Sequence, residues 1–208
     1  MGTVWAIVVA AGTGDRFGRP KQFEILGGRR VVDWAVDAAR KACDGVVTVL
    51  PPGHADGEGA VEGGATRSAS VRAGLAAVPP DAEIVVVHDA ARPLAEPELF
   101  DRVVGAVRGG ADGAIAAAPL TDTVKGVDGD RVVETLDRRA LVAVQTPQAF
   151  RATTLRTAHA GDPEATDDAA LVEAAGGTVV VVAAPRWNIK ITEPDDLAVA
   201  QALLKVRS

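Results

Sequence analysis

The chain has 208 residues, 48% of them apolar, and a formal net charge of −6. That length suits one domain with a full core, the apolar content excludes intrinsic disorder, and the negative charge argues against general binding to nucleic acid or an anionic membrane. A lone Cys43 leaves no internal disulfide and no CxxC metal knuckle. The N-terminus lacks the basic region of a secretory signal, and no apolar run reaches the ~20 residues that span a bilayer, so we expect a cytoplasmic protein.

Short apolar, β-branched runs alternate with Ala-rich stretches of helical spacing along the whole chain. The expected strands, in chain order, are 4–10, 46–50, 84–88, 113–117, 178–183 and 188–191. The expected helices are 31–42, 68–78, 96–108, 152–160 and 167–175, with a last helix that begins at 192–195. Several strands are continuously apolar, as parallel strands buried on both faces are. The alternation predicts one α/β domain, residues 1–208, folded as a three-layer sandwich around a mostly parallel, Rossmann-like sheet.

One segment, 121–144, breaks this alternation. Asp128-Gly129 lies between two β-like runs, which is a strong signal for a hairpin. Neither run is very hydrophobic, so we expect the hairpin to project from the sheet as a β-arm. Because an isolated hairpin is marginally stable in water, it needs a partner, and a second subunit is the natural one.

The first expected strand runs into a glycine-rich turn, Gly12-Thr13-Gly14, with Arg16 and Lys21 close behind it. The turn lacks the GK[ST] of a Walker loop and the spacing of the dinucleotide fingerprint, which excludes a P-loop ATPase and argues against a redox Rossmann protein. Backbone amides at such a turn, beside two cations, suit a polyphosphate. The alternative is an ordinary strand-to-loop turn with two solvated charges.

A second candidate site follows the third expected strand, where His88, Asp89 and Arg92 lie close together in the sequence. Ligands of open α/β sheets bind beyond the carboxyl ends of strands, so Asp89 could hold Mg²⁺ or orient a substrate hydroxyl. A structural pair between Asp89 and Arg92 is the alternative. His54 and His159 have no ligand spacing and are expected at the surface. No HExxH and no Ser/His/Asp ordering supports a hydrolase.

Three further segments carry groups that could face an anion. Gly63-Gly64 leads into a helix whose first amides suit an anion or a base edge; Ser68 is the expected N-cap, and Ser70 is better placed for a ligand. Lys190 lies in the last expected strand. Because the chain has only five lysines, a lysine inside an apolar strand suggests a specific role. Thr146-Pro147 is expected to be extended loop.

In combination, these segments resemble the family of cytidylyltransferases that act on 2-C-methyl-D-erythritol 4-phosphate in isoprenoid precursor synthesis. The similarity covers nearly the whole chain in order, and its most specific parts are the segments HDAARP and NIKIT. The matching segments are AAGTGDR at 10–16, PKQF at 20–23, GG at 63–64, RSASV at 67–71, HDAARP at 88–93, DTVK at 122–125, TPQ at 146–148 and NIKIT at 188–192.

The resemblance implies transfer of CMP from CTP to this polyol phosphate, with Mg²⁺ as cofactor and a homodimer formed through the β-arm. It implies three groups of site residues. Those at the nucleotide are the backbone of Ala10, Ala11 and Gly12, with Gly64 and Ser70 at the cytosine and Asp89 at the ribose or the metal. The catalytic cations at the phosphates are Arg16, Lys21 and Lys190. Those at the acceptor are Arg92, Thr146, Thr123 and Arg138, of which the last two are implied to reach the neighbouring subunit's site.

Two features depart from the family pattern. The stretch from Arg16 to Pro20 is about two residues shorter, so this loop can close differently on the triphosphate, and Ala65 stands where an acidic residue often follows the glycine pair. The acceptor stays open at this point: ribitol 5-phosphate cytidylyltransferases share the glycine turn and the terminal lysine motif. Another sugar-phosphate nucleotidyltransferase and a catalytically silent nucleotide-binding regulator are further alternatives.

Overall fold

The computed structural model describes residues 2–14, 17–56 and 59–207. Within them, the chain forms a seven-stranded sheet in the order β11-β7-β10-β6-β1-β4-β5. Its strands are β1 (Val4–Val9), β4 (Gly45–Leu50), β5 (Val61–Glu62), β6 (Ile84–Asp89), β7 (Gly113–Pro119), β10 (Val142–Arg151) and β11 (Val179–Ala183). Neighbouring strands pair in parallel except at β10, which runs antiparallel to both β6 and β7.

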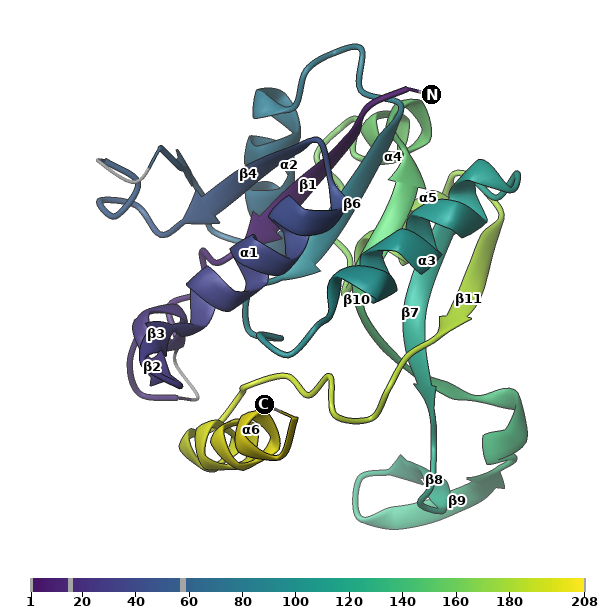
Figure 1. The fold of residues 1–208 in the computed structure, drawn as a ribbon. Coiled ribbons are helices and arrows are strands. Elements are labelled where there is room, and N and C mark those ends of the chain that lie inside the picture. The colour runs from purple at the N-terminus through teal and green to yellow at the C-terminus, as the bar shows by residue number, and fades with distance from the viewer. Residues whose placement is uncertain (1, 15–16, 57–58, 208) are drawn as a thin grey trace.

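Helices cover both faces of this sheet, which confirms the predicted three-layer α/β fold (Figure 1). α1 (Val31–Ala42) and α3 (Pro97–Arg108) pack on one face. α2 (Arg67–Ala77), α4 (Ala152–Ala158) and α5 (Asp168–Ala174) pack on the other. The last helix, α6 (Pro194–Arg207), packs beside a small hairpin of β2 (Ile25–Leu26) and β3 (Arg29–Arg30). In the described part of the chain, no helix has the length and apolar character needed to cross a membrane.

The central strand β6 explains why the sheet forms and where a ligand can bind. All six of its residues are buried. Because successive side chains point to opposite faces, Val86 joins the core under α1 and α3, whereas Val85 and Val87 join the core under α2, α4 and α5. β1 lies beside β6 with Val9 opposite Asp89. The turn that follows β1 therefore starts next to the acidic end of β6.

Two segments differ from the strands expected from the sequence. The segment 188–191 is not a strand; it is an irregular connection ahead of α6. Conversely, 142–151 forms β10, where the sequence predicted extended backbone at Thr146-Pro147 but no strand. The Thr146–Pro147 peptide is cis, and the pairing of β10 with β7 shifts register between Val144 and Gln148. Tertiary pairing with β6 and β7 thus outweighs the weak strand propensity of this segment.

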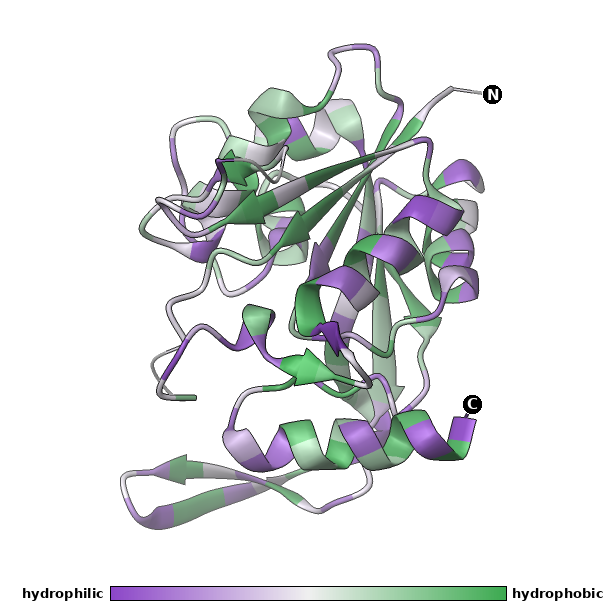
Figure 2. Cartoon of the chain, turned by 60° about the vertical axis from the view of Figure 1, so that its left-hand side comes forward, coloured by the Kyte–Doolittle hydropathy of each residue, from purple (hydrophilic) through white to green (hydrophobic). Residues whose placement is uncertain are grey.

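The predicted hairpin is present as β8 (Val124–Asp128) and β9 (Arg131–Leu136), which pair only with each other within the described residues. It projects from the end of β7, away from the sheet (Figure 1). Figure 2 shows hydrophobic positions on both of its strands, and Val127, Val132 and Val133 are all more than half exposed. The paired strands end at Leu136, and the last residues of the predicted segment 121–144 belong to β10, which begins at Val142.

Candidate active site

A cavity of about 570 Å³ opens at the carboxyl ends of β1 and β6. Its walls are the glycine turn after β1, the start of α2 with the residues before it, the end of β6, and Lys190 from the segment before α6. Ligand sites in proteins commonly enclose ~300–1,000 Å³, so this cavity has room for a nucleotide. Six residues predicted for the nucleotide and two of the three predicted cations line it: Ala10, Ala11, Gly12, Gly64, Ser70, Asp89, Lys21 and Lys190.

The glycine turn is held in place by backbone contacts. Ala10 N donates to Val49 O at 2.8 Å, and Gly12 O accepts from Gln22 Nε2 at 3.0 Å. Gly14 has φ of +79°, and a Cβ there would lie 1.9 Å from the carbonyl oxygen of Arg19, so only glycine fits. Lys21 follows in the short 3-10 helix η1 (Lys21–Phe23) and lines the cavity. Arg16 lies outside the described residues.

The glycine pair before α2 allows a close approach to this turn. A Cβ on Gly63 would lie 2.3 Å from the Cβ of Ala11, and one on Gly64 would lie 2.5 Å from the Cβ of Ala69. Thr66, not Ser68, is the N-cap of α2, because its side chain accepts from Ala69 N at 3.0 Å. The prediction of Ser68 as the cap was wrong, since the helix already begins at Arg67.

Ser70 has its hydroxyl turned toward the backbone of its own helix. It is buried and donates to Thr66 O at 2.9 Å. Serine hydroxyls within helices commonly donate to the carbonyl oxygen one turn earlier, and the hydroxyl oxygen can still accept a hydrogen bond from a ligand. Ser68 has another role: its Oγ accepts from Ala165 N at 3.3 Å and ties α2 to the segment before α5.

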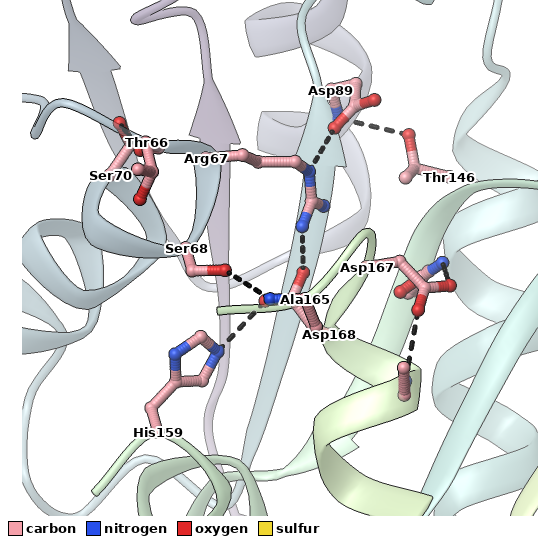
Figure 3. Close-up of polar contacts among 12 residues, drawn as sticks. Thr66, Arg67, Ser68, Ser70, Asp89, Thr146, His159, Ala165, Asp167 and Asp168 are labelled. Atoms are coloured by element: carbon pink, nitrogen blue, oxygen red, sulfur yellow. Dashed lines mark hydrogen bonds and ion pairs between the residues drawn. The ribbon is translucent and has the colours of Figure 1, made fainter. Parts of the chain in front are cut away.

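Asp89 is the charged centre of the cavity. Its Oδ2 lies 2.7 Å from Lys190 Nζ and its Oδ1 lies 3.3 Å from Arg67 Nε (Figure 3 shows the contact with Arg67). Burial opposes ionisation of this carboxyl, but Arg67 and Lys190 outweigh it and hold the pKa of Asp89 well below its usual range. The alternative pairing with Arg92 is replaced by these two contacts. Arg92 instead donates to the carbonyl oxygens of Asn188 and Val144.

His88 is a structural residue, fully buried on β6. Burial lowers the pKa of His88 to about 4, so the ring is neutral at pH 7. Asp89 N donates to Thr146 Oγ1, and Thr146 Oγ1 is 3.1 Å from His88 Nδ1. Since His88 Nε2 lies 3.3 Å from Arg92 O, a proton on Nε2 and a lone pair on Nδ1 satisfy every member of this chain. Thr146 therefore fixes the backbone of Asp89.

The segment that carries Lys190 is pinned on both sides. Asn188 is fully buried, and its Nδ2 donates to Gln145 Oε1 at 2.8 Å and to Thr146 O at 2.9 Å. Ile191 N donates to Ala91 O at 2.8 Å, and the Ile191 side chain is buried against α6. These anchors, rather than strand pairing, direct Lys190 into the cavity.

The chain matches the model of the family described as IspD, 2-C-methyl-D-erythritol 4-phosphate cytidylyltransferase, over residues 4–206. It belongs to this family. The cytidylyltransferase of that name from Nocardia farcinica is 46% identical over 224 aligned residues, which cover 100% of this chain and 96% of the relative. The one from Rubrobacter xylanophilus is 43% identical, with 97% of this chain and 95% of the relative covered.

Solved structures agree with the family assignment. The enzyme of this name from Thermus thermophilus is 37% identical with a TM-score of 0.83, and 99% of this chain and 100% of that one are covered. The 4-diphosphocytidyl-2C-methyl-D-erythritol synthase from Anaerococcus prevotii is 32% identical with a TM-score of 0.86, covering 98% and 99%. The protein is thus a cytidylyltransferase. Its reaction is the CTP-dependent cytidylyl transfer to 2-C-methyl-D-erythritol 4-phosphate in isoprenoid precursor biosynthesis, as the sequence predicted.

None of the four residues predicted for the acceptor, Arg92, Thr146, Thr123 and Arg138, is among the described residues that line the cavity. Thr123 and Arg138 are exposed at the base of the hairpin. Arg138 donates to the carbonyl oxygen of Thr121, which holds it against the start of the arm. Within one chain, then, the residues predicted for the nucleotide lie together at the cavity, whereas the described residues that line it include none of those predicted for the acceptor.

Three polar residues escaped the sequence analysis: Arg67, which lines the cavity, and Asp168 and His159 behind it. Arg67 and Asp168 form an ion pair of 2.8 Å across 101 positions of sequence, and His159 contacts Asp168. The expectation that His159 lies at the surface was wrong: its side chain is 3% exposed. His54 is exposed, as expected. No local sequence pattern predicts such a long-range pair. The one available signal was the position of Arg67, directly after the cap Thr66 and shortly after the glycine pair.

Proposed function

We propose that the cavity binds CTP and that Lys21 and Lys190 act on its phosphates from opposite walls, together with Arg16. The observation that carries this proposal is Lys190, whose ammonium lies 2.7 Å from Asp89 inside a cavity that also contains Lys21 and a glycine turn. Backbone amides and fixed cations suit a triphosphate. The buried anchors Asn188 and Ile191 support a fixed position for Lys190.

The rest of the nucleotide follows from the cavity walls. The backbone of Ala10, Ala11 and Gly12 frames the nucleotide, while Gly64 and Ser70 contact the cytosine. Support comes from the close approach of the glycine pair to Ala11, which leaves a narrow wall of backbone that suits a flat base. With Ala65 in place of an acidic residue, contact with the base through that side chain is lost and backbone contacts take its place.

Chemistry by in-line displacement suits these residues. A phosphate oxygen of the acceptor attacks the α-phosphorus of CTP; the new P–O bond forms as the bond to the bridging oxygen breaks, and pyrophosphate leaves with the electron pair. The attacking oxygen is already ionised, so no general base is needed, in keeping with a neutral, buried His88. Catalysis then consists of positioning and of cations that stabilise the developing charge.

Mg²⁺ fits this site as cofactor. Asp89 is the carboxylate among the described lining residues, and Mg²⁺ is usually held by one or two carboxylates together with substrate phosphates. When bound, Mg²⁺ would neutralise phosphate charge and draw the two anionic substrates together. We propose Asp89 as its ligand, or as the group that contacts the ribose.

We further propose that the acceptor binds at a site completed by a second subunit. Arg92 and Thr146 both contact the backbone of Asp89. Thr123 and Arg138 of the partner subunit are proposed to reach them through the β-arm, residues 121–144, which is part of the single domain. The exposed valines of the hairpin support this proposal, because an isolated hairpin with an apolar surface is stabilised by a partner. A homodimer of this kind is proposed to act in the cytoplasm.

The experiment is a pyrophosphate-release assay with the purified protein and a divalent metal. CTP with 2-C-methyl-D-erythritol 4-phosphate is expected to give rapid release, whereas UTP, GTP and ATP with the same acceptor are expected to give little. Ribitol 5-phosphate is the matched alternative acceptor. Faster release with ribitol 5-phosphate, or equal release with every nucleotide, would contradict the proposal.

A further inference from the structure

A line of ion pairs that ends in a hydrogen bond to His159 runs from Asp89 into the layer of α4 and α5 (Figure 3). Arg67, in the first turn of α2, lies between two carboxylates: its Nε is 3.3 Å from Asp89 Oδ1 and its Nη1 is 2.8 Å from Asp168 Oδ2. The other oxygen of Asp168 is 2.9 Å from His159 Nε2. With Lys190 on Asp89, the order is Lys190, Asp89, Arg67, Asp168, His159.

The inner end of this line is fixed, and its outer end is accessible. The side chains of Asp168 and His159 are 1% and 3% exposed, whereas that of Lys190 is 38% exposed. His159 Nδ1 is buried and has no hydrogen-bond partner among the described residues, so the ring proton belongs on Nε2, where it is donated to Asp168. The Arg67 guanidinium is therefore held from behind by a carboxylate that has little freedom to move.

We propose that Arg67 is a positioning residue for the cytidylyl transfer. Asp168 and His159 hold its guanidinium in place, where its positive charge balances the negative charge of Asp89. Lys190 is then able to leave Asp89 and contact the triphosphate. This inference rests on the proposed function of Lys190. In the structure Lys190 is paired with Asp89, yet its proposed role requires the ammonium to contact phosphate. Without Arg67, moving it away would leave the Asp89 carboxylate, which is only 12% exposed, without a close counter-charge until Mg²⁺ is bound, which is strongly unfavourable. Arg67 removes that cost because it stays with Asp89 when Lys190 moves.

A purely structural Arg67 would behave differently. If it only fastened α2 to α5, its loss would lower stability and would slow the enzyme equally whether Lys190 is present or not. If it acts through Lys190, its loss should matter only while Lys190 is present. The two roles are therefore separated by the coupling between the two residues.

The experiment is a double-mutant cycle on kcat for cytidylyl transfer, with Arg67→Met, Lys190→Met and both together. Arg67→Met is expected to lower kcat about 10–100-fold, by analogy with the groups that orient metal ligands. In the Lys190→Met background the further loss is expected to stay below about 3-fold, and Arg67→Lys is expected to restore part of the rate. Equal losses in both backgrounds would overturn the proposal.

Arg72→Met is the matched control. Arg72 lies on the same helix, its side chain is 21% exposed, and it pairs with Asp162 and Glu164. None of these three is among the described residues that line the cavity. Its loss is expected to lower the melting temperature only slightly, because partly exposed ion pairs contribute little to stability. It is expected to leave kcat within about 2-fold, because Arg72 does not line the cavity.

If Arg67→Met alone does not fold, Arg67→Met with Asp168→Asn removes the partly buried guanidinium together with its buried carboxylate partner and keeps the test decisive. This double variant is expected to fold and to remain slow; turnover equal to that of Arg72→Met would refute the role of Arg67. A wild-type protein that transfers no cytidylyl group would contradict the proposed function and this inference with it. An active wild type whose Arg67 variants are unaffected would contradict the inference alone.

Discussion

Replacing Lys190 by methionine should separate catalysis from stability. An ammonium about 4 Å from a phosphoryl charge contributes roughly 4 kcal/mol at an effective dielectric constant near 20, which corresponds to ~10³ in rate. The side chain is 38% exposed, so solvent screening reduces this figure, and we expect kcat to fall about 10²-fold to 10³-fold. Stability should change by less than about 1 kcal/mol, because Arg67 still neutralises Asp89 and the ion pair is partly solvated.

The assay is pyrophosphate release at saturating CTP and methylerythritol phosphate, alongside urea unfolding of both proteins. Lys205→Met is the control, since Lys205 is an exposed lysine on α6 and does not line the cavity. It should match wild type in both measurements. A Lys190→Met variant that folds normally and turns over within about 3-fold of wild type would refute the role given to this lysine.

Three further predictions concern Asn188, His88 and the sharing of the site between subunits. Asn188→Ala removes two buried hydrogen bonds to β10 and should cost about 2–3 kcal/mol in urea unfolding and slow turnover about 10-fold; unchanged values would contradict the anchoring role. His88, with its pKa lowered to about 4 by burial, should show ring proton resonances that stay constant from pH 8 to 5. Histidine in the unfolded chain takes up a proton near pH 6.5, whereas buried His88 does not. The free energy of unfolding should therefore fall by about 3 kcal/mol as the pH drops from about 6.5 toward 4. A ring that titrates near pH 6.5 in the folded protein would contradict this. Mixing Lys190→Met with Arg138→Met, each inactive alone, should restore about a quarter of wild-type activity if the site is shared between subunits, and no recovery on mixing would contradict it.

Much of the fold followed from the sequence because its signals are local. The continuous apolar run of β6 predicts a strand buried on both faces, and Asp128-Gly129 predicts the hairpin from two residues. The segment 188–191 was misassigned because alternating apolar and polar residues favour a strand, while the buried amide of Asn188 fixes it as an irregular connection. β10 was missed because its polar residues and proline weaken the strand signal, and its neighbours β6 and β7 supply the pairing.

The candidate site likewise has a part that local sequence signals predict and a part that depends on long-range contacts. The glycine turn and Asp89 could be predicted to meet, because carboxyl ends of parallel strands share one edge of a sheet. Arg67, Asp168 and His159 could not, since their contacts join positions up to 101 residues apart and none has a distinctive local motif. His159 was misassigned to the surface for this reason: histidine has no strong preference for the interior, and only the fold reveals its carboxylate partner.

The central claim, attack of an acceptor phosphate oxygen on the α-phosphorus of CTP, is tested most directly by an isotope experiment. Methylerythritol phosphate labelled with ¹⁸O in its phosphate oxygens would be converted with unlabelled CTP, and both products would be analysed by mass spectrometry. The account predicts that all of the label remains in the CDP-linked methylerythritol and none enters pyrophosphate. Label in the released pyrophosphate, or loss of label from the CDP-linked product, would contradict it.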